Sequence, residues 1–220
     1  MRILHCVESY YPAVGGMPEV VRRLSEGLVH LGHEVTVATS HMQNRQSDFL
    51  NGIRIVSFTL AGRLADGIVG DPTEQRKYQE FIADPHFEVV VFFAAQQWSC
   101  DLALPVLHSI TAKKVFVPTG FSGLHLPVFQ DYYSLMPNWL LKYDMNVFLS
   151  NDYQDINFAR AYGVKKYMII PNGASAKEFL KIRDYDFRRD KSLPENSKIL
   201  LLVGSHTGEK GHYEDRKSVV

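Results

Sequence analysis

The stretch from Tyr10 to Ser40 decides the fold, and it reads YYPAVGGMPEVVRRLSEGLVHLGHEVTVATS. It follows a short apolar strand expected at Arg2–Val7, and it places Gly15 and Gly16 directly before a segment with helical spacing. A proline and a glutamate suit the first turn of that helix. The segment HEVTVATS then predicts a second strand. Strand, helix and strand in this order predict a βαβ unit, in which the two strands run parallel.

The helix of this unit is expected to pack on the sheet through one apolar stripe. The apolar positions at helical spacing are Val20, Val21, Leu24, Leu28 and Leu31. Gly32 follows the last of them and is the expected capping residue at the end of the helix, because glycine readily adopts the left-handed backbone found there.

Residues 1–174 repeat this alternation of strands and helices. Further strands are expected at Ile53–Phe58, Glu88–Ala95, Lys114–Gly120, Met145–Ser150 and in KYMIIPNG. Helices are expected in TEQRKYQEFIAD, in DLALPVLHSI with a kink at Pro105, in LMPNWLLKY, and in DYQDINFARAYG with Gly163 as its cap. Continuous apolar strands that alternate with helices predict a doubly wound α/β domain, whose parallel sheet is covered on both faces.

The remainder of the chain has a different character. Residues 175–197 are charged and broken by Pro194, so we expect a linker with one short helix. Residues 198–220 begin with KILLLVG, which predicts the strand and loop that open a second α/β domain. A lone parallel strand cannot bury its own side chains, so either a domain is missing or this segment docks on the first domain.

The composition excludes several classes of protein. A formal net charge of +0 argues against a nucleic-acid-binding protein, which needs a basic face. Cys6 and Cys100 fit no metal-ligand spacing; Cys6 is expected to be a buried free thiol, and so few cysteines suggest a reducing compartment. No apolar run is long enough for a signal peptide or a membrane span. We therefore expect a cytoplasmic protein, and peripheral contact with the inner face of the membrane stays open.

The glycine pair lies where open parallel sheets bind ligands, at the carboxyl end of a strand. A helix N-terminus there points its backbone N–H groups at an anion, and glycine lets the backbone approach the ligand closely. The segment after the pair, MPEVV, has no third glycine, so this is not the dinucleotide-binding fingerprint. Taken alone, the pair is equally consistent with a simple turn from strand to helix.

Four segments together resemble the N-terminal half of the retaining GT-B glycosyltransferases, the group that includes glycogen synthases and phosphatidylinositol mannosyltransferases. They are YYPAVGGMPEVVRRLSEGLVHLGHEVTVAT, YDMNVFLSNDYQDINFARAYGV, IIPNGAS and LLLVGSHTGEKGH, and they span nearly the whole chain in the order expected for the family. The resemblance implies a Rossmann-like N-terminal half of a GT-B fold over residues 1–174, a hinge at 175–197, and the start of a donor-binding domain at 198–220.

The resemblance also implies a reaction, the transfer of a hexose from a nucleotide-sugar donor with its anomeric configuration retained. Gly15 and Gly16 would approach the donor diphosphate and the transferred sugar. Lys210 matches the phosphate-binding lysine of the family, where it would neutralise the leaving diphosphate. The acceptor is expected to be a sugar, a polysaccharide or a lipid-linked molecule. No metal and no further cofactor are expected, and the resemblance assigns no catalytic residue.

The acceptor side of the site departs from the family. A histidine usually stands near the sugar in the loop after the strand that begins at Lys114, but here Pro118, Thr119 and Gly120 occupy that place. Thr119 and Gly120 are therefore the acceptor-side candidates. His125 lies a few residues later in GFSGLHLP and is a further candidate, with a simple surface role as the favoured alternative.

Other departures concern the donor side. Ser175 replaces the aspartate of the hinge motif, and Ser205 or His206 replaces an arginine. The E-x7-E motif that grips the donor in the family belongs to a part that this chain does not contain, and Glu209 and Glu214 near the end of the chain do not have that spacing. We therefore expect an incomplete enzyme with little activity alone. Two alternatives stay open: a truncated, non-catalytic module that binds carbohydrate or a partner protein, and a sugar-nucleotide isomerase of the same architecture.

Overall fold

The computed structural model describes residues 1–180, 185–201 and 203–204. The chain divides into two compact units, Met1–Gly173 and Ala174–Val220, and each is described by itself. The residue expected to bind phosphate, Lys210, lies outside the described residues. The division of the chain into acceptor-side domain, hinge and donor-side domain stays a prediction.

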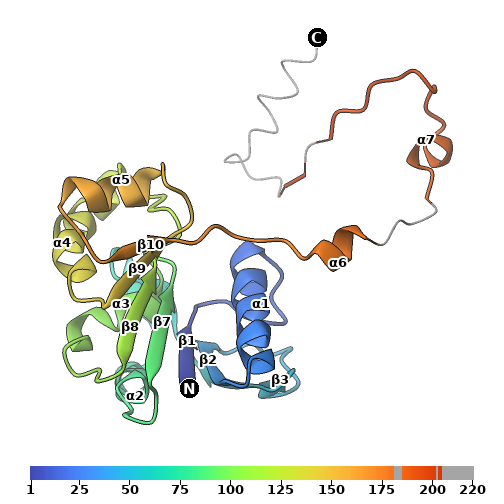
Figure 1. Ribbon diagram of the computed structural model, residues 1–220. Helices are drawn as coiled ribbons and strands as arrows, with labels where there is room; N and C mark the ends of the chain where they lie inside the picture. The colour runs from blue at the N-terminus through green and yellow to red at the C-terminus, as the bar shows by residue number, and fades with distance from the viewer. Residues whose placement is uncertain (181–184, 202, 205–220) are drawn as a thin grey trace. The chain divides into compact units, whose positions relative to one another are not determined.

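The first unit is built on an eight-stranded sheet with the order β10-β9-β8-β7-β1-β2-β4-β3 (Figure 1). The strands are β1 Arg2–Cys6, β2 Glu34–Ser40, β3 Phe49–Leu50, β4 Ile53–Phe58, β7 Val89–Phe93, β8 Lys113–Val117, β9 Met145–Phe148 and β10 Tyr167–Ile169. Every pair in the sheet is parallel except β3 with β4. The predicted parallel α/β fold is confirmed, and so are the strands predicted before residue 174.

Helices lie on both faces of this sheet. They are α1 Gly16–His30, α2 Pro72–Ile82, α3 Trp98–Asp101, α4 Gln130–Leu140 and α5 Gln154–Ala161, with 3₁₀ turns η1 Leu104–Val106 and η2 Pro127–Phe129. Side chains of α2 to α5 form the larger core with Leu4 of β1 and Phe92 of β7. On the opposite face, α1 contributes Val21 to a smaller core with Ile3 and Phe93. Alternate residues of one strand therefore enter different cores, as they do in any sheet buried on both sides.

The end of α1 confirms the glycine cap. Gly32 has φ +84°, and its N–H donates to the Val29 carbonyl at 2.9 Å. The His33 N–H donates to the Leu28 carbonyl at 3.0 Å, which completes the Schellman arrangement of a helix C-terminus. The turn aims the chain back into β2, so the βαβ unit closes as the sequence predicts.

The packing stripe of α1 was predicted wrongly in part. Val21 is fully buried, but Leu24 is 43% exposed and Leu31 is 73% exposed. Ser25 is fully buried instead; its hydroxyl donates to the Val21 carbonyl at 2.7 Å and lies 2.8 Å from Nδ1 of His5 in β1. A small polar residue at this position lets the helix sit directly over His5, so the leucines turn to the flank of the helix.

Other differences between the predicted and the observed elements concern short helices and strands. The helix predicted in DLALPVLHSI is replaced by the single turn of α3 and by η1, because Pro105 has no N–H to donate. The helix predicted in LMPNWLLKY starts earlier than expected, as α4. A hairpin of β5 Ala61–Arg63 and β6 Gly67–Val69 was not predicted, since each strand has only three residues.

Among its described residues, the second unit has two short helices, α6 Ala176–Phe179 and α7 Phe187–Asp190. The strand predicted from residue 198 is not formed by the described residues 198–201 and 203–204, which carry no helix or strand. Over the part of the chain that the structure describes, no helix is long and apolar enough to cross a membrane.

Two glycines of the first unit predict opposite effects of the same substitution. A Cβ at Gly123 would lie 2.6 Å from Cε2 of Phe129, a distance that real side chains do not reach. Gly123→Ala should therefore destabilise the fold by about 1–3 kcal/mol through overpacking. Gly27→Ala, inside α1 with nothing within 4 Å of the new methyl group, should stabilise it by about 0.5–1 kcal/mol. Urea unfolding monitored by circular dichroism tests both, and two variants of equal stability would contradict the packing described for Gly123.

Candidate functional site

The candidate site lies at the carboxyl edge of the sheet, where the loops after β1, β7 and β8 emerge (Figure 1). The order of the strands reverses between β1 and β7, since β1 continues to β2 on one side while β7 continues to β8 on the other. Loops that diverge at such a reversal leave room for a ligand.

Gly15 and Gly16 begin α1 at this edge. Gly15 is the N-cap residue with φ 169° and ψ 169°, an extended backbone open to any residue, and no side chain caps the helix start. A Cβ on Gly15 would make an ordinary contact with Pro18 at 3.5 Å, and a Cβ on Gly16 would meet nothing within 4 Å. Neither the backbone nor the packing of this unit therefore requires glycine at these two positions.

The loop before the glycine pair is fixed by Arg45, which follows β2. Its Nε donates to the Tyr11 carbonyl at 2.9 Å, and Nη1 donates to the Ser40 carbonyl at 3.1 Å and to Oγ of Ser57 at 2.7 Å. Partial burial lowers the pKa of Arg45, with the charge of Asp48 opposing that shift. One guanidinium thus ties the loops after β1 and β2 to β4, so the glycine pair is presented on a held backbone.

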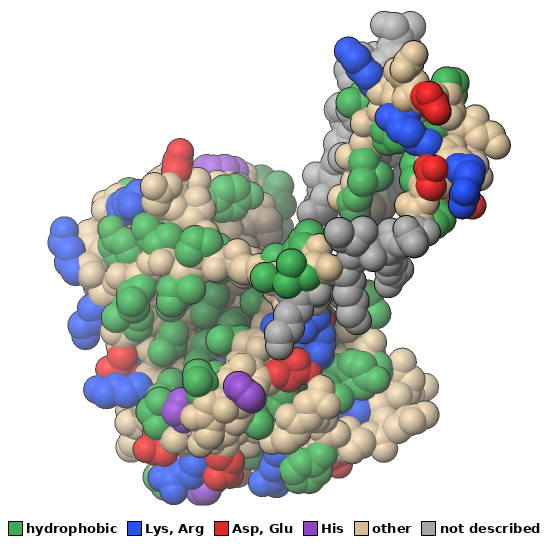
Figure 2. All heavy atoms as spheres, turned by 45° about the vertical axis from the view of Figure 1, so that its right-hand side comes forward, with side chains coloured by type: hydrophobic (Ala, Val, Ile, Leu, Met, Phe, Trp, Pro, Cys, Tyr) green, Lys and Arg blue, Asp and Glu red, His purple; other side chains and the backbone are tan. Residues whose placement is uncertain are grey.

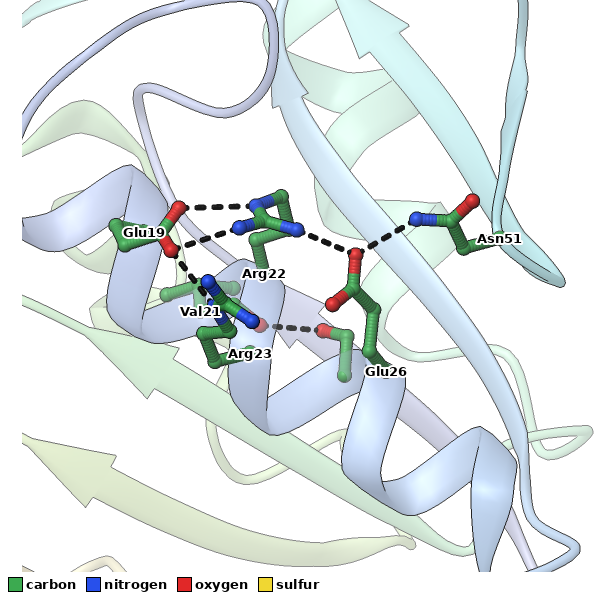
Figure 3. Close-up of polar contacts among 7 residues, drawn as sticks. Glu19, Val21, Arg22, Arg23, Glu26 and Asn51 are labelled. Carbon is green, nitrogen blue, oxygen red and sulfur yellow. Dashed lines mark hydrogen bonds and ion pairs between the residues drawn. The ribbon is translucent and has the colours of Figure 1, made fainter. Parts of the chain in front are cut away.

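The arginines of α1 next to the pair are already neutralised (Figure 3). Arg22 donates twice to Glu19, at 2.9 and 2.7 Å, and Arg23 donates to the same carboxylate at 2.7 Å. Arg22 also donates to Glu26 at 2.7 Å, and Glu26 accepts from Asn51 at 2.8 Å. The hydrogen bonds from Arg22 and Arg23 lower the pKa of Glu19 to about 2. Any attraction of an anion to this helix start therefore comes from the backbone dipoles.

The loops after β7 and β8 both take left-handed backbone. Ala94 has φ +65° and Gln96 has φ +61° after β7, while Thr119 has φ +60° and Phe121 has φ +52° after β8. Such angles cost energy for residues other than glycine and are held only where the surroundings enforce them. The N–H of Ala94 donates to the Val117 carbonyl at 2.9 Å, which locks the two loops together.

Gly120, one of the predicted acceptor-side residues, is held from α5. Burial raises the pKa of Asp155, and hydrogen bonds from the N–H groups of Ile156 and Gly120 oppose that shift. Gly120 has φ +115°, which strongly favours glycine, and a Cβ there would lie 3.0 Å from the ring of Tyr153. Thr119 beside it is half-buried. Gly120 is therefore required by the fold, whatever its role in binding.

His125 lies elsewhere on the unit. It is exposed and lines an apolar groove of about 490 Å³ between the loop after Gly123, α4 and α5. The groove is also lined by Leu124, Leu126, Pro127, Gln130, Tyr133, Ser134, Phe158 and Tyr162. Neither the glycine pair nor Thr119 and Gly120 is among these lining residues, so the structure does not group His125 with them.

A polar network at the carboxyl edge was missed from the sequence. Asp101 is 2% exposed; it accepts from the Leu64 N–H at 2.8 Å and from the Tyr132 hydroxyl at 2.8 Å. That hydroxyl in turn accepts from the Gln96 N–H at 3.0 Å. The network joins the β5–β6 hairpin to α3, to α4 and to the strained loop after β7, so it holds these four elements together at the edge.

Glu8 and Arg63 extend this network toward solvent. Glu8 lies two residues after the end of β1, and partial burial raises the pKa of its carboxyl while the Gly62 N–H and the charge of Arg63 oppose the shift. Arg63 stacks over the ring of Phe129, with its central carbon 5.0 Å from the ring centroid. In the sequence, the signal that could have revealed this network is a polar residue directly after an apolar run, and Glu8 is such a residue. Asp101 carried none, because it lies in a segment predicted as a regular helix.

A metal ion has no obvious place here. Among the described residues, no three His, Cys, Asp or Glu side chains are grouped so that they could hold one. Cys6 and Cys100 are both free and buried, and burial raises the pKa of Cys6 to about 12. Neither thiol is suited to act as a nucleophile, since that chemistry needs an accessible thiolate.

The buried carboxyl of Asp101 predicts a pH dependence of stability. Burial raises its pKa from 3.8 to about 6, so the folded protein holds this proton more tightly than the unfolded chain does. The stability from protonated Asp101 is therefore fully present below pH 3.8 and is lost as the pH rises through about 6. This difference in pKa corresponds to about 3 kcal/mol.

Asp101→Asn removes the titration of this carboxyl. The difference between wild type and variant therefore separates the contribution of Asp101 from that of other groups, such as His5, whose pKa burial lowers to about 3. The unfolding free energy of the wild type minus that of the variant should fall between pH 4 and pH 7. Chemical denaturation at several pH values measures the difference, and two parallel pH profiles would contradict a raised pKa at Asp101.

The chain resembles known proteins in its structure. No protein-family model matches the chain, and no curated protein matches it. Among solved structures, a sucrose-phosphate synthase from Thermosynechococcus elongatus is 17% identical, with a TM-score of 0.63, over 88% of this chain and 53% of its own. A second structure of that synthase is 15% identical, with a TM-score of 0.50, over 81% of this chain and 93% of its own.

A further match is WaaG, a glycosyltransferase involved in lipopolysaccharide biosynthesis, which is 18% identical with a TM-score of 0.63 over 98% of this chain and 58% of its own. The chain thus spans 53% and 58% of the lengths of the synthase and of WaaG. At these identities the likeness concerns the fold. The chain has the Rossmann-like α/β fold, with a mostly parallel sheet, that is found in GT-B glycosyltransferase structures.

Proposed function

We propose that this chain is the acceptor-side half of a retaining GT-B glycosyltransferase. In this proposal a hexosyl group passes from a nucleotide-sugar donor to a sugar, a polysaccharide or a lipid-linked acceptor. The fold shared with the matched structures makes the proposal reasonable, but a fold alone carries no function.

The observation that carries the proposal is the unexplained glycine pair. Glycine costs stability in a helix, and at Gly15 and Gly16 the folded unit neither uses left-handed backbone nor lacks room for a side chain. What remains is a close approach by something outside the unit. An uncapped helix start at the carboxyl edge of a parallel sheet favours an anion, and a donor diphosphate supplies one.

The chemistry needs charge stabilisation at that point. As the bond from the anomeric carbon to the diphosphate oxygen breaks, the pair of electrons stays on the diphosphate. The acceptor oxygen forms the new bond on the same face, and its proton passes to the departing diphosphate oxygen. N–H groups aimed at the departing oxygen lower this barrier. Lys210 would supply further positive charge.

The acceptor would be held by the carboxyl edge of the sheet. The Gly120 N–H donates there to Asp155, and the half-buried carboxylate of Glu8 can accept hydrogen bonds from sugar hydroxyls. Asp101 and Tyr132 act behind these groups, as positioning residues that hold the loop after β7.

The isolated chain should show little or no sugar transfer. In this proposal the E-x7-E motif that grips the donor in the family belongs to the other half of the enzyme, so most of the binding energy for the nucleotide lies outside this chain, which spans 53% and 58% of the lengths of the synthase and of WaaG. Incubation with radiolabelled nucleotide sugars and a panel of sugar and lipid-linked acceptors tests this. Robust transfer by the isolated chain would contradict the assignment of donor binding to a missing half.

One substitution in the glycine pair should raise the stability of the fold and weaken the binding of a nucleoside diphosphate. Gly16→Ala places a methyl group in open space at the start of α1, so the unfolding free energy should rise by about 0.5 kcal/mol. The same methyl group should obstruct a bound diphosphate and weaken the binding of UDP, GDP or ADP by about tenfold, which is about 1.4 kcal/mol. Calorimetric titration and urea unfolding measure the two effects.

Gly27→Ala is the matched control in the same helix. It should stabilise α1 in the same direction and leave nucleoside diphosphate binding unchanged, because Gly27 lies away from the helix start. If Gly16→Ala bound the nucleoside diphosphates as tightly as the wild type, the glycine pair would not be a diphosphate site.

A further inference from the structure

The sheet of the first unit has a basic amino edge, at the end opposite the candidate site. Strands β8, β9 and β10 begin next to one another there, because they are neighbours in the sheet and run parallel. Five lysines lie at or just before the starts of these strands, and we call them the lysine edge. They are Lys113, Lys114, Lys142, Lys165 and Lys166. Three separate segments of the chain supply them, so the topology of the sheet is what brings them together.

Hydrogen bonds hold the segments that carry the lysines side by side. The Lys114 N–H donates to the Asp144 carboxylate at 2.9 Å, and the Asp144 N–H donates to the Lys114 carbonyl at 2.9 Å. The fully buried Asn146 donates from its side-chain amide to the Leu140 carbonyl at 3.0 Å and to the Lys166 carbonyl at 3.1 Å. The fold therefore fixes the backbone of the lysine edge.

Little negative charge opposes the lysine edge. The segments that lead into the three strands are 111–114, 141–144 and 162–166, and the structure describes all of them. Asp144 is the one carboxylate in these segments, so five lysines and one aspartate give a net charge of +4, although the whole chain has a formal net charge of +0. Asp144 forms ion pairs with Lys113 at 3.5 Å and with Lys114 at 3.4 Å. The other three lysines are exposed and form no ion pair with a described residue.

The five lysine charges act together. Neighbouring strands lie about 4.8 Å apart, so the starts of β8 to β10 span about 10 Å. The Debye length at about 0.1 M salt is also about 10 Å, so an anionic surface meets these charges as one field. The other half of the amino edge carries both signs, since Arg2 of β1 pairs with Glu88 before β7 at 3.5 Å and Glu34 begins β2. Figure 2 shows Lys and Arg side chains along one side of the first unit, at the left of that view.

Exposed apolar side chains stand among the lysines. Leu141, directly before Lys142, is 59% exposed, and Tyr162, three residues before Lys165, is 57% exposed. A tyrosine has an apolar ring and a polar hydroxyl, so it is favoured at the boundary between water and lipid. Basic residues beside exposed apolar ones provide the two kinds of attraction that hold a peripheral protein on a membrane.

We propose that the lysine edge binds a membrane surface that contains anionic lipids. The lysines lie against the lipid headgroups, and Leu141 and Tyr162 enter the layer between the headgroups and the acyl chains. A small apolar contact holds a protein on a membrane only weakly, and a basic cluster supplies the second attraction that makes binding stable. The inference does not rest on the proposed function, because the candidate site lies at the carboxyl edge of the sheet and stays free when the amino edge is bound.

Other partners fit the lysine edge less well. The phosphates of a nucleic acid favour arginine, whose planar guanidinium binds two oxygens at once, and the lysine edge contains no arginine. A phosphate backbone also offers no apolar layer to Leu141 and Tyr162. A second copy of the chain presents the same positive edge, and like charges repel. A lipid surface supplies negative charge and an apolar layer together, so it matches both features.

Co-sedimentation of the full chain with lipid vesicles tests the proposal. The anionic vesicles contain phosphatidylcholine and about one third phosphatidylglycerol, and the neutral vesicles contain phosphatidylcholine alone. At about 0.1 M salt the chain should bind the anionic vesicles at least about tenfold more tightly than the neutral ones. Raising the salt to about 1 M shortens the Debye length to about 3 Å and should release most of the bound protein.

Matched variants localise the binding. Lys165→Gln with Lys166→Gln removes two charges from the lysine edge and should weaken binding to the anionic vesicles by about thirtyfold, which is about 2 kcal/mol. The control, Arg76→Gln with Lys77→Gln, removes two charges from α2 and should weaken binding by less than about threefold. Leu141→Ser should weaken binding by about fivefold, because the leucine no longer enters the lipid. All five side chains are exposed, so each variant should fold, and circular dichroism checks this.

Three results would overturn the proposal. They are no binding to the anionic vesicles, equal binding to the anionic and the neutral vesicles, and an equal loss of binding in the paired lysine variant and its α2 control. Soluble polyglutamate and duplex DNA add a fourth test. Binding to either of them that is as tight as binding to the anionic vesicles, and that Leu141→Ser leaves unchanged, would identify an acidic polypeptide or a nucleic acid as the partner instead.

Discussion

The parallel pairing of β1 with both β2 and β7 is the constraint on which the rest of this structure depends. It places the loops after β1 and β7 side by side at one edge while their connections run in opposite directions. The glycine pair, the strained loop at Gln96 and the buried Asp101 all belong to that edge. A shift of β1 by one residue would exchange Ile3 and Leu4 between the two cores, so the hydrophobic alternation fixes the edge as well.

Two kinds of polar group keep this edge in shape. Buried carboxylates accept backbone N–H groups, as Asp101 does from Leu64 and as Asp155 does from Gly120. The Arg45 guanidinium donates to the backbone around the glycine loop. A buried polar group is stabilising only when it is paired, so each of these side chains specifies one arrangement of the loops it joins. The glycine pair differs from them, because nothing in the first unit explains it.

The sequence predicted the sheet far better than the edge. Apolar runs such as VVVFF are favourable in a strand that is buried on both faces of a sheet, so the strands and their parallel order could be predicted. The β5–β6 hairpin could not, since its strands of three residues have no usable period. Gly15 and Gly16 were found by their position after β1. Asp101 was missed because its role depends on Tyr132, which lies 31 residues away and meets it only in the folded unit. The leucines of α1 were expected in the core for a related reason, since periodicity gives the stripe but not the direction it faces.

The central claim is that a diphosphate approaches the backbone at the start of α1. The most direct measurement is a ¹H–¹⁵N NMR titration of the full chain with a nucleoside diphosphate, which reports on each backbone N–H separately. The account predicts that the largest shifts fall on Gly15, Gly16 and Met17, with smaller shifts in the loop held by Arg45. Shifts confined to other parts of the chain, or no shifts at millimolar nucleotide, would contradict it.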